Sequence, residues 1–212
     1  MEARKIVFAT GNRGKLREAS EILGEGFELY TPMDFGLTDD IPETGTTLEE
    51  NSLQKADYIF ERKGCDCFAD DTGLEVEALG GAPGVFTARY AGESKDFGKN
   101  MDKVLSELEA LEAANPSTTR RARFRSVVTL ILDGKVHQFE GVMDGTIARG
   151  KSGRGGFGYD PIFIPDEYPG LTAADITEEQ KNEISHRGKA LRAMAAFLNT
   201  YCHPEQSEGS DS

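Results

Sequence analysis

A long alternating run near the middle of the chain constrains the fold more than any other feature. The run is RARFRSVVTLIL, residues 121–132, and its polar and apolar side chains alternate as in a single long strand. Asp133-Gly134 follows, a dipeptide favoured in tight hairpin turns, and KVHQFEG, residues 135–141, returns antiparallel. The fold must therefore contain a sheet large enough to hold a long β-hairpin.

Helical and extended patterns alternate through the rest of the chain. The predicted strands are KIVFAT (5–10), FELYT (27–31), CFAD (67–70) and DGTIA (144–148), and the predicted helices cover 15–24, a segment from about 47, 102–114 and 185–198. Thr47 with Glu50 has the capping-box pattern, and Ser185 is the expected N-cap of the last helix. Residues 79–92 and 153–165 are glycine-rich loops, and the second leads into a short strand.

This order of elements predicts a mixed α/β protein. No internal repeat or linker divides the chain, and two lobes with a cleft between them are compatible with the order. We expect a single domain over residues 1–202 and a disordered acidic tail, HPEQSEGSDS, over 203–212.

The charge balance limits the partners. Lys and Arg total 24 against 37 Asp and Glu, and the net charge of -13 repels DNA and acidic membranes. No apolar stretch is long enough to span a bilayer. Three cysteines form neither a disulfide framework nor a paired zinc motif, which fits a reducing compartment, and we expect a cytoplasmic protein.

The tripeptide Asp71-Thr72-Gly73 is also the signature around the catalytic carboxylate of aspartic proteases. Those enzymes need two such aspartates that share a proton. Here the tripeptide occurs once, with Asp70 beside it. The protease interpretation is therefore a distant alternative.

Two kinds of residue favour a phosphate ligand. TGNRGK, Thr10 to Lys15, stands where a strand gives way to a helix N-terminus, so its N–H groups and Lys15 would face an anion. An ordinary turn with a solvated lysine is the alternative. Several carboxylates also suit Mg²⁺ as hard oxygen ligands, namely Glu43, Glu49, Glu50, Asp70 and Asp71. A solvated acidic face explains Glu49, whereas the adjacent aspartates require a compensating cation or hydrogen bonds.

Two further segments offer ligand contacts near the C-terminus. GGFGYDP, residues 155–161, allows close backbone approach and offers Phe157 and Tyr159 as stacking surfaces, although core aromatics in a tight turn are the alternative. SHRGK places His186, Arg187 and Lys189 in the first turn of a helix, where cations oppose the helix dipole. This placement suggests a ligand that needs donors, with exposed basic residues as the plain alternative.

Five blocks in order resemble the inosine triphosphate pyrophosphatase family. They are FATGNRGK, ETG with EEN and Lys55, ADDTGLEVEALGGAPGVFTARYAG, GGFGYDPIF and ISHRGKAL, and together they span about residues 4–199. The resemblance implies a long twisted sheet with flanking helices, two lobes around a central active-site cleft, and a homodimer. It also implies Mg²⁺-assisted hydrolysis of ITP, dITP and XTP to the monophosphate and pyrophosphate.

The resemblance assigns roles to individual residues. Asp71 is the implied proton acceptor, and Glu43, Asp70 and Asp71 are the implied metal ligands. The implied phosphate contacts are Thr10, Gly11, Asn12, Arg13, Gly14, Lys15 and Lys55. The implied base pocket comprises Phe157, Gly158, Tyr159, Asp160, Lys181, His186 and Arg187. Thr72 is a further implied substrate contact; it stands where many members carry serine and keeps the hydroxyl. A purine nucleotide sensor without turnover is the alternative from another functional class.

Overall fold

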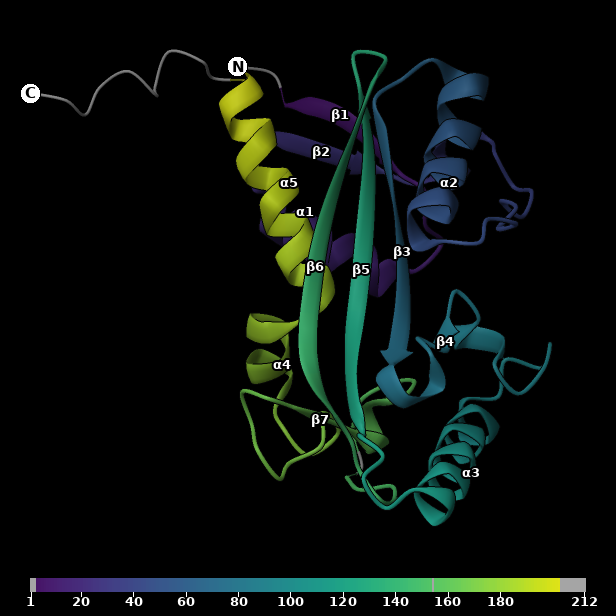
Figure 1. The fold of residues 1–212 in the computed structure, drawn as a ribbon. Helices are drawn as coiled ribbons and strands as arrows, with labels where there is room; N and C mark the ends of the chain where they lie inside the picture. Colours follow the sequence, from purple (N-terminus) through teal and green to yellow (C-terminus); the bar gives the residue numbers. More distant parts are fainter. Residues whose placement is uncertain (1–2, 154, 203–212) are drawn as a thin grey trace, which may run out of the picture.

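We describe residues 3–153 and 155–202 of a computed structural model, in which one mixed sheet organises the chain (Figure 1). The strands are β1 (Arg4–Phe8), β2 (Phe27–Tyr30), β3 (Cys67–Val76), β4 (Pro83–Gly84), β5 (Arg121–Leu132), β6 (Lys135–Ile147) and β7 (Phe163–Pro165). The helices are α1 (Arg13–Leu23), α2 (Leu48–Lys63), α3 (Phe97–Ala114), α4 (Glu178–Ile184) and α5 (His186–Cys202). This mixed α/β architecture confirms the predicted fold class.

The sheet combines a parallel part with a long antiparallel part. Its order is β2-β1-β3-β5-β6-β7, with β4 added to β3. β1 pairs in parallel with β2 and β3, whereas β3, β5, β6 and β7 are antiparallel neighbours. The predicted hairpin is confirmed, because Leu132 pairs with Lys135 across the Asp133-Gly134 turn.

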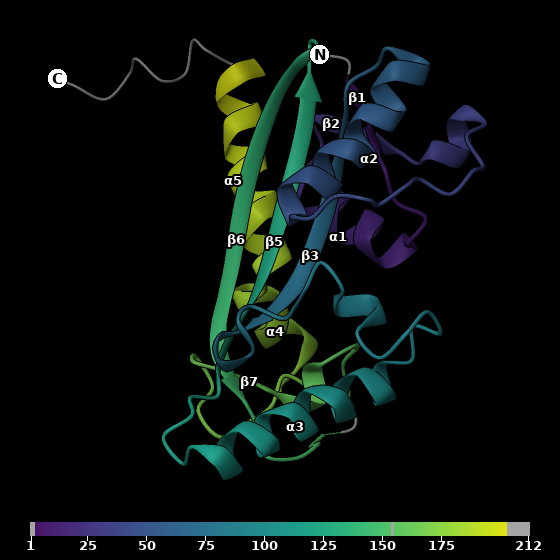
Figure 2. The same ribbon diagram turned by 45° about the vertical axis from the view of Figure 1, so that its right-hand side comes forward.

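Helices cover both faces of the sheet (Figures 1 and 2). α1 and α5 pack on one face over a core that includes Phe8, Phe68 and Leu191. α2 packs on the opposite face, where Ala56 and Ile59 meet the strands. α3 lies beside the lower ends of the long strands. Among the described helices, none is long and apolar enough to cross a membrane.

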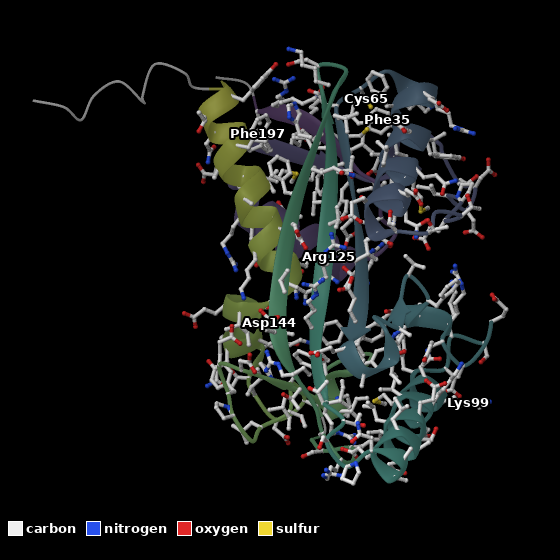
Figure 3. All side chains as sticks on the ribbon, in the orientation of Figure 1. Phe35, Cys65, Lys99, Arg125, Asp144 and Phe197 are labelled. Carbon is white, nitrogen blue, oxygen red and sulfur yellow. The ribbon has the colours of Figure 1, made fainter. Side chains whose placement is uncertain are left out.

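The sheet face below α2 carries charged pairs in place of a helix. Arg125 lies near the middle of β5 (Figure 3), where its guanidinium contacts Glu49 of α2 and Glu140 of β6. Two residues before Arg125 on β5, Arg123 Nε lies 2.7 Å from Glu75 Oε2. Such partly exposed pairs contribute about 0–1 kcal/mol each. Glu49 thus belongs to a solvated charged face, as its sequence context suggested.

The structure corrects three predicted boundaries. β3 runs for 10 residues, so Asp70 and Asp71 lie in the middle of a strand and not at its end. β6 continues through Gly141 to Ile147 as one strand, where two strands were expected. α3 begins at Phe97, five residues before the expected start at 102. Pairing with distant residues extends both strands beyond their local signals, whereas the local N-cap Asp96 sets the start of α3.

One short helix was not predicted. α4 has only seven residues, and its signal is the capping box that Thr177 forms with Gln180. Ser185 ends α4 and also accepts a hydrogen bond from the N–H of Gly188 at 3.0 Å, which confirms it as the N-cap of α5. The predicted acidic tail, residues 203–212, lies outside the described residues.

Gly141 permits the close contact between β6 and the start of α5. A Cβ atom at this position would lie 2.0 Å from the carbonyl oxygen of His186 and 2.5 Å from the amide nitrogen of Ala190. A backbone atom cannot move away as easily as the end of a side chain. The close approach therefore requires glycine.

We predict that Gly141→Ala lowers the free energy of unfolding by about 1–3 kcal/mol, the usual cost of overpacking. The matched control is Gly150→Ala, where an added Cβ would meet no heavy atom within 4 Å. Urea denaturation of both variants measures the effect. Equal stability of the two variants would contradict the packing described here.

Candidate active site

The site forms along one edge of β3. β1 pairs only with the first two residues of β3, and β4 pairs only with Leu74 and Glu75. Among the described residues, no strand occupies the edge between these two pairings. Leu74 directs its N–H to this edge, where it donates to Thr87 Oγ1 at 2.8 Å. Since alternate residues of a strand share an edge, the backbones of Asp70 and Thr72 face the same gap.

The pleat of β3 sends the adjacent aspartates to opposite faces of the sheet. Cys67 and Ala69 pack in the core under α2, whereas Phe68 packs in the core under α1 and α5. By the same alternation, Asp70 points toward α1 and α5 and Asp71 points toward α2. The two carboxylates therefore avoid each other and recruit different cations.

Asp70 is buried between two cations. Lys15 Nζ lies 3.0 Å from Oδ1 and 2.8 Å from Oδ2 of Asp70, and Arg187 Nε donates to Oδ2 at 3.1 Å. Arg187 also donates to Glu18 of α1 at 3.1 Å. The cluster joins the predicted phosphate loop to the first turn of α5.

Asp71 shares a buried ammonium with Glu43 on the other face. Lys55 Nζ donates to Asp71 Oδ1 at 2.9 Å and to Glu43 Oε1 at 2.7 Å. Lys55 is only 8% exposed, so its charge depends largely on these two partners. The three predicted residues thus form one contact group.

Side chains of α2 hold the segment that carries Glu43. Asn51 Oδ1 accepts from the N–H of Gly45 at 2.8 Å, and Gln54 Oε1 accepts from the N–H of Thr44 at 2.9 Å. The Thr47 hydroxyl caps α2 by accepting from the N–H of Glu50. The Glu50 carboxylate accepts from Thr46, which gives it a structural contact at the start of α2.

These contacts shift the ionisation of the buried groups. Burial alone would raise the pKa of Asp70, but the charges of Lys15 and Arg187 outweigh it and lower that pKa. Burial raises the pKa of Asp71, and Lys55 offsets only part of the rise. Burial would lower the pKa of Lys55, but nearby carboxylates, Asp71 foremost, raise it. The adjacent aspartates therefore differ in proton affinity.

The predicted phosphate loop has a fixed turn before α1. Asn12 is the N-cap, and its Oδ1 accepts from the N–H groups of Gly14 at 2.8 Å and Lys15 at 3.2 Å. Thr10 Oγ1 accepts from the N–H of Asn12 at 3.1 Å. Gly11 and Arg13 are exposed. Two of the helix donors expected to face an anion are thus occupied by the Asn12 side chain in this structure.

The predicted nucleobase loop has one exposed aromatic ring and one buried aromatic ring. Phe157 is 74% exposed and contacts the edge of Phe97, whereas Tyr159 is only 1% exposed. Because its ring is buried, Tyr159 is a core aromatic and not a stacking surface. Its hydroxyl donates to the backbone carbonyl of Thr87 inside the protein. Asp160 is buried beside Lys181, and Gly158 has a positive φ of 68° that favours glycine.

His186 begins α5 as a neutral residue. Both of its ring nitrogens are buried without a hydrogen-bond partner among the described residues, and the ring stacks on Phe124 with centroids 5.0 Å apart. Burial, with the charges of Arg187 and Lys181, lowers the pKa of His186 to about 3. The sequence pattern suggested a cation at this position, and that interpretation is wrong because burial disfavours the charged imidazole.

The structure groups the predicted residues into three clusters. Lys15 and Arg187 meet Asp70, Glu43 and Lys55 meet Asp71, and Lys181 meets Asp160. The hydroxyl of Thr72 is directed to Ser126 at 3.1 Å and joins none of the clusters.

Sequence reasoning missed Glu18, the second partner of Arg187. Its signal was helical spacing, because Glu18 stands three residues after Lys15 and shares that face of α1. It also missed Thr87, which lies in the glycine-rich loop 79–92 and contacts β3. No local pattern distinguished that threonine.

Metal ligands were predicted at Glu43, Asp70 and Asp71. Among residues 3–153 and 155–202, no three His, Cys, Asp or Glu side chains converge as a ready-made metal cage. Instead, each of the three carboxylates contacts a lysine.

The site therefore combines an α/β fold with buried, cation-paired carboxylates beside a strand–loop–helix turn. The model of the Ham1 family matches residues 6–197, so the chain belongs to that family, and the predicted family relationship is confirmed. The chain is 48% identical over 194 residues to a dITP/XTP pyrophosphatase of Flavobacterium psychrophilum, covering 92% of this chain and 98% of the relative.

Two further comparisons agree with this assignment. The chain is 42% identical over 197 residues to a dITP/XTP pyrophosphatase of Bacillus subtilis, covering 92% of this chain and 97% of the relative. The solved structure of the Staphylococcus aureus Ham1 protein matches with a TM-score of 0.85 and 37% identity, covering 93% of this chain and 100% of that chain. Sequence and fold therefore support the same family.

The neutral His186 should make stability depend on pH. Its pKa is about 3 in the folded chain, and an unfolded histidine titrates near ~6.5, so below that pH only the unfolded state takes up the proton. Stability from this residue is complete above about pH 6.5 and falls as the pH drops toward 3. We predict that wild type loses about 2 kcal/mol more than His186→Phe between pH 7.5 and 5.0, measured by urea denaturation. Parallel losses in the two proteins would contradict a neutral His186.

Proposed function

We propose that this chain hydrolyses the non-standard purine nucleoside triphosphates ITP, dITP and XTP to the monophosphate and pyrophosphate. The observation that carries the proposal is the pair of cation-bound carboxylates at the open edge of β3, Asp70 with Lys15 and Asp71 with Lys55. Relatives that match nearly the whole chain are named dITP/XTP pyrophosphatase. Removal of these compounds from the nucleotide pool is the corresponding biological role.

The cations supply the charge that a triphosphate requires. Lys15 follows the TGN turn on one face of β3, and Lys55 lies on the other face. In the free protein their ammonium groups contact aspartates, and a triphosphate would compete for the same donors. As pyrophosphate leaves, negative charge builds on its oxygens, and fixed cations stabilise that charge.

Asp71 is the group that we assign to the attacking water. Its carboxylate lies in a partly buried position and is aligned by Lys55 at 2.9 Å. A carboxylate held in this way can accept a proton from water, or orient it, as the water attacks the α-phosphorus. The reaction then needs no covalent intermediate.

The donor set fits Mg²⁺ better on one face than on the other. Glu43 and Asp71 offer carboxylate oxygens around a shared cation position, and Mg²⁺ commonly uses one or two carboxylates with substrate phosphates and water. Both oxygens of Asp70 contact Lys15, so Asp70 fits the role of a cation anchor more readily. When bound, Mg²⁺ would neutralise phosphate charge and polarise the phosphoryl group.

The predicted nucleobase side combines an exposed ring with partly buried cations. Phe157 can stack on a purine, and Lys181 and Arg187 can donate hydrogen bonds. Hypoxanthine and xanthine present an acceptor oxygen at C6, where adenine presents a donor amine. Donors that face C6 favour hypoxanthine and xanthine and disfavour adenine, because the amine of ATP would meet another donor there.

The same proposal includes the assembly and location of the protein. It comprises a single domain over residues 1–202 with two lobes around a cleft, a homodimer, and a cytoplasmic location without nucleic-acid or membrane partners. The family resemblance supports the domain arrangement and the dimer, and the net charge of -13 supports the lack of nucleic-acid and acidic-membrane partners.

We predict strong turnover of ITP, dITP and XTP, weak turnover of ATP, and a loss of about 10²–10⁴-fold in kcat for Asp71→Asn. The assay measures phosphate release with added inorganic pyrophosphatase, since pyrophosphate alone gives little signal. Asp144→Asn, at an exposed position on β6 (Figure 3), is the matched control and should retain wild-type turnover. Tight ITP binding without turnover would instead indicate a nucleotide sensor, and equal rates on all nucleotides would overturn base selection.

We also predict that removal of divalent ions stops turnover and that added Mg²⁺ restores it. Glu43→Gln should raise the Mg²⁺ concentration for half-maximal turnover by about tenfold, because one oxygen ligand loses its charge. Glu109→Gln, at an exposed position on α3, should leave it unchanged. Turnover that persists in excess chelator would exclude the metal from the proposal.

A further inference from the structure

The turn formed by residues 83–89 connects the two parts of the proposed site, the carboxylates of β3 and the nucleobase loop. It includes β4 (Pro83–Gly84) and the short 3₁₀ helix η3 (Thr87–Arg89), within the glycine-rich loop whose function the sequence left open. Gly84 rests directly on β3, because a Cβ atom at Gly73 would lie 2.7 Å from the carbonyl oxygen of Gly84. The turn is therefore held against the strand that carries Asp71.

The hydroxyl of Thr87 completes this contact. It accepts from the N–H of Leu74 at 2.8 Å and donates to the carbonyl of Gly84 at 2.6 Å. Leu74 is fully buried and stands three residues after Asp71 on β3. The hydroxyl thus satisfies the Leu74 N–H at the point where the open edge of β3 ends against β4.

The carbonyl of Thr87 makes the second connection. It accepts from the phenol of Tyr159 at 2.9 Å, and Tyr159 is 1% exposed. Tyr159 lies between Phe157 and Asp160 of the nucleobase loop, where Asp160 contacts Lys181. One residue therefore links the carboxylate strand to the nucleobase loop, through its side chain in one direction and its backbone in the other.

Asn100 of α3 keeps the turn in place. Its side chain is fully buried, accepts from the N–H of Ala91 at 2.6 Å and donates to the carbonyl of Ala88 at 3.0 Å. These bonds fix the backbone on the far side of Thr87. The turn is consequently held both by β3 and by α3.

We propose that Thr87 is a positioning residue that sets the nucleobase loop relative to Asp71 and thereby determines selectivity among purine triphosphates. The proposal rests on the proposed function. Lys15 and Lys55 contact β3 without help from this turn, so loss of the link should displace the base more than the phosphates. Selectivity should therefore change more than triphosphate binding.

The test compares Thr87→Val with Thr87→Ser, using kcat and KM for ITP and ATP. Valine keeps the shape and leaves the Leu74 N–H without its partner, and we expect the ratio of kcat/KM for ITP over ATP to fall about tenfold, mainly through kcat for ITP. Serine keeps the hydroxyl and should retain a ratio within about twofold of wild type. The ratio does not depend on how much enzyme is folded, so a merely structural role would leave it unchanged.

Thr129→Val is the matched control. This buried threonine of β5 also loses a hydroxyl contact, with Ser52 at 2.7 Å, and should lower stability without changing the ratio. An unchanged ratio in Thr87→Val, or an equal loss in Thr87→Ser, would overturn the role of Thr87. Absence of ITP turnover in wild type would overturn the proposed function itself.

Hydrogen exchange gives a readout that needs no turnover. Thr87→Val should speed exchange by about tenfold at the Leu74 amide, because that N–H loses its acceptor, and also in residues 157–160, because the residue-87 carbonyl that Tyr159 contacts is no longer held against β3 by the hydroxyl. Faster exchange at Leu74 alone would show that the nucleobase loop is not coupled to β3, and it would overturn the proposal.

Discussion

The burial of a carboxylate in the middle of β3 is the constraint on which the rest of the site depends. An isolated buried carboxylate is costly, and removal of one partner from a buried pair typically costs about 3–5 kcal/mol. Asp70 is 3% exposed, and its charge is balanced by Lys15 of α1 and Arg187 of α5. This balance draws the start of both helices to the same place on the sheet, and with them the TGN turn and the SHR segment.

Because side chains alternate along β3, a second carboxylate–cation pair forms on the other face of the sheet. Asp71 faces the opposite side and requires its own cation, which α2 supplies as Lys55. Cations therefore flank a single strand on both faces, at a point where its edge has no neighbouring strand among the described residues. A phosphate chain that crosses this edge would meet both lysines and the backbone of Asp70 and Thr72, which explains why the chemistry is concentrated on so short a segment.

Much of the fold was readable because its signals are local. The Asp133-Gly134 turn, the cap at Thr47 and the helical spacing after Lys15 each depend on near neighbours in the sequence. The length of β3 was not readable, because Gly73 weakens the local strand signal and because ten residues of β5 supply the pairing. The sequence left Tyr159 open between a stacking surface and a core aromatic for a related reason, since its partner carbonyl lies 72 residues away.

The sequence by itself determined the kinds of groups in the site and the family to which the chain belongs. A turn rich in amide and lysine donors, adjacent aspartates and a glycine-flanked aromatic are properties of short segments. These residue types favour a phosphate ligand, and their order along the chain carries the resemblance to the family. Only the tertiary structure decided which charge meets which. Arg187 reaches Asp70 across 117 residues of sequence, and burial leaves His186 neutral beside it. Pairing and ionisation depend on distance and on exclusion of water, and the folded chain alone sets both.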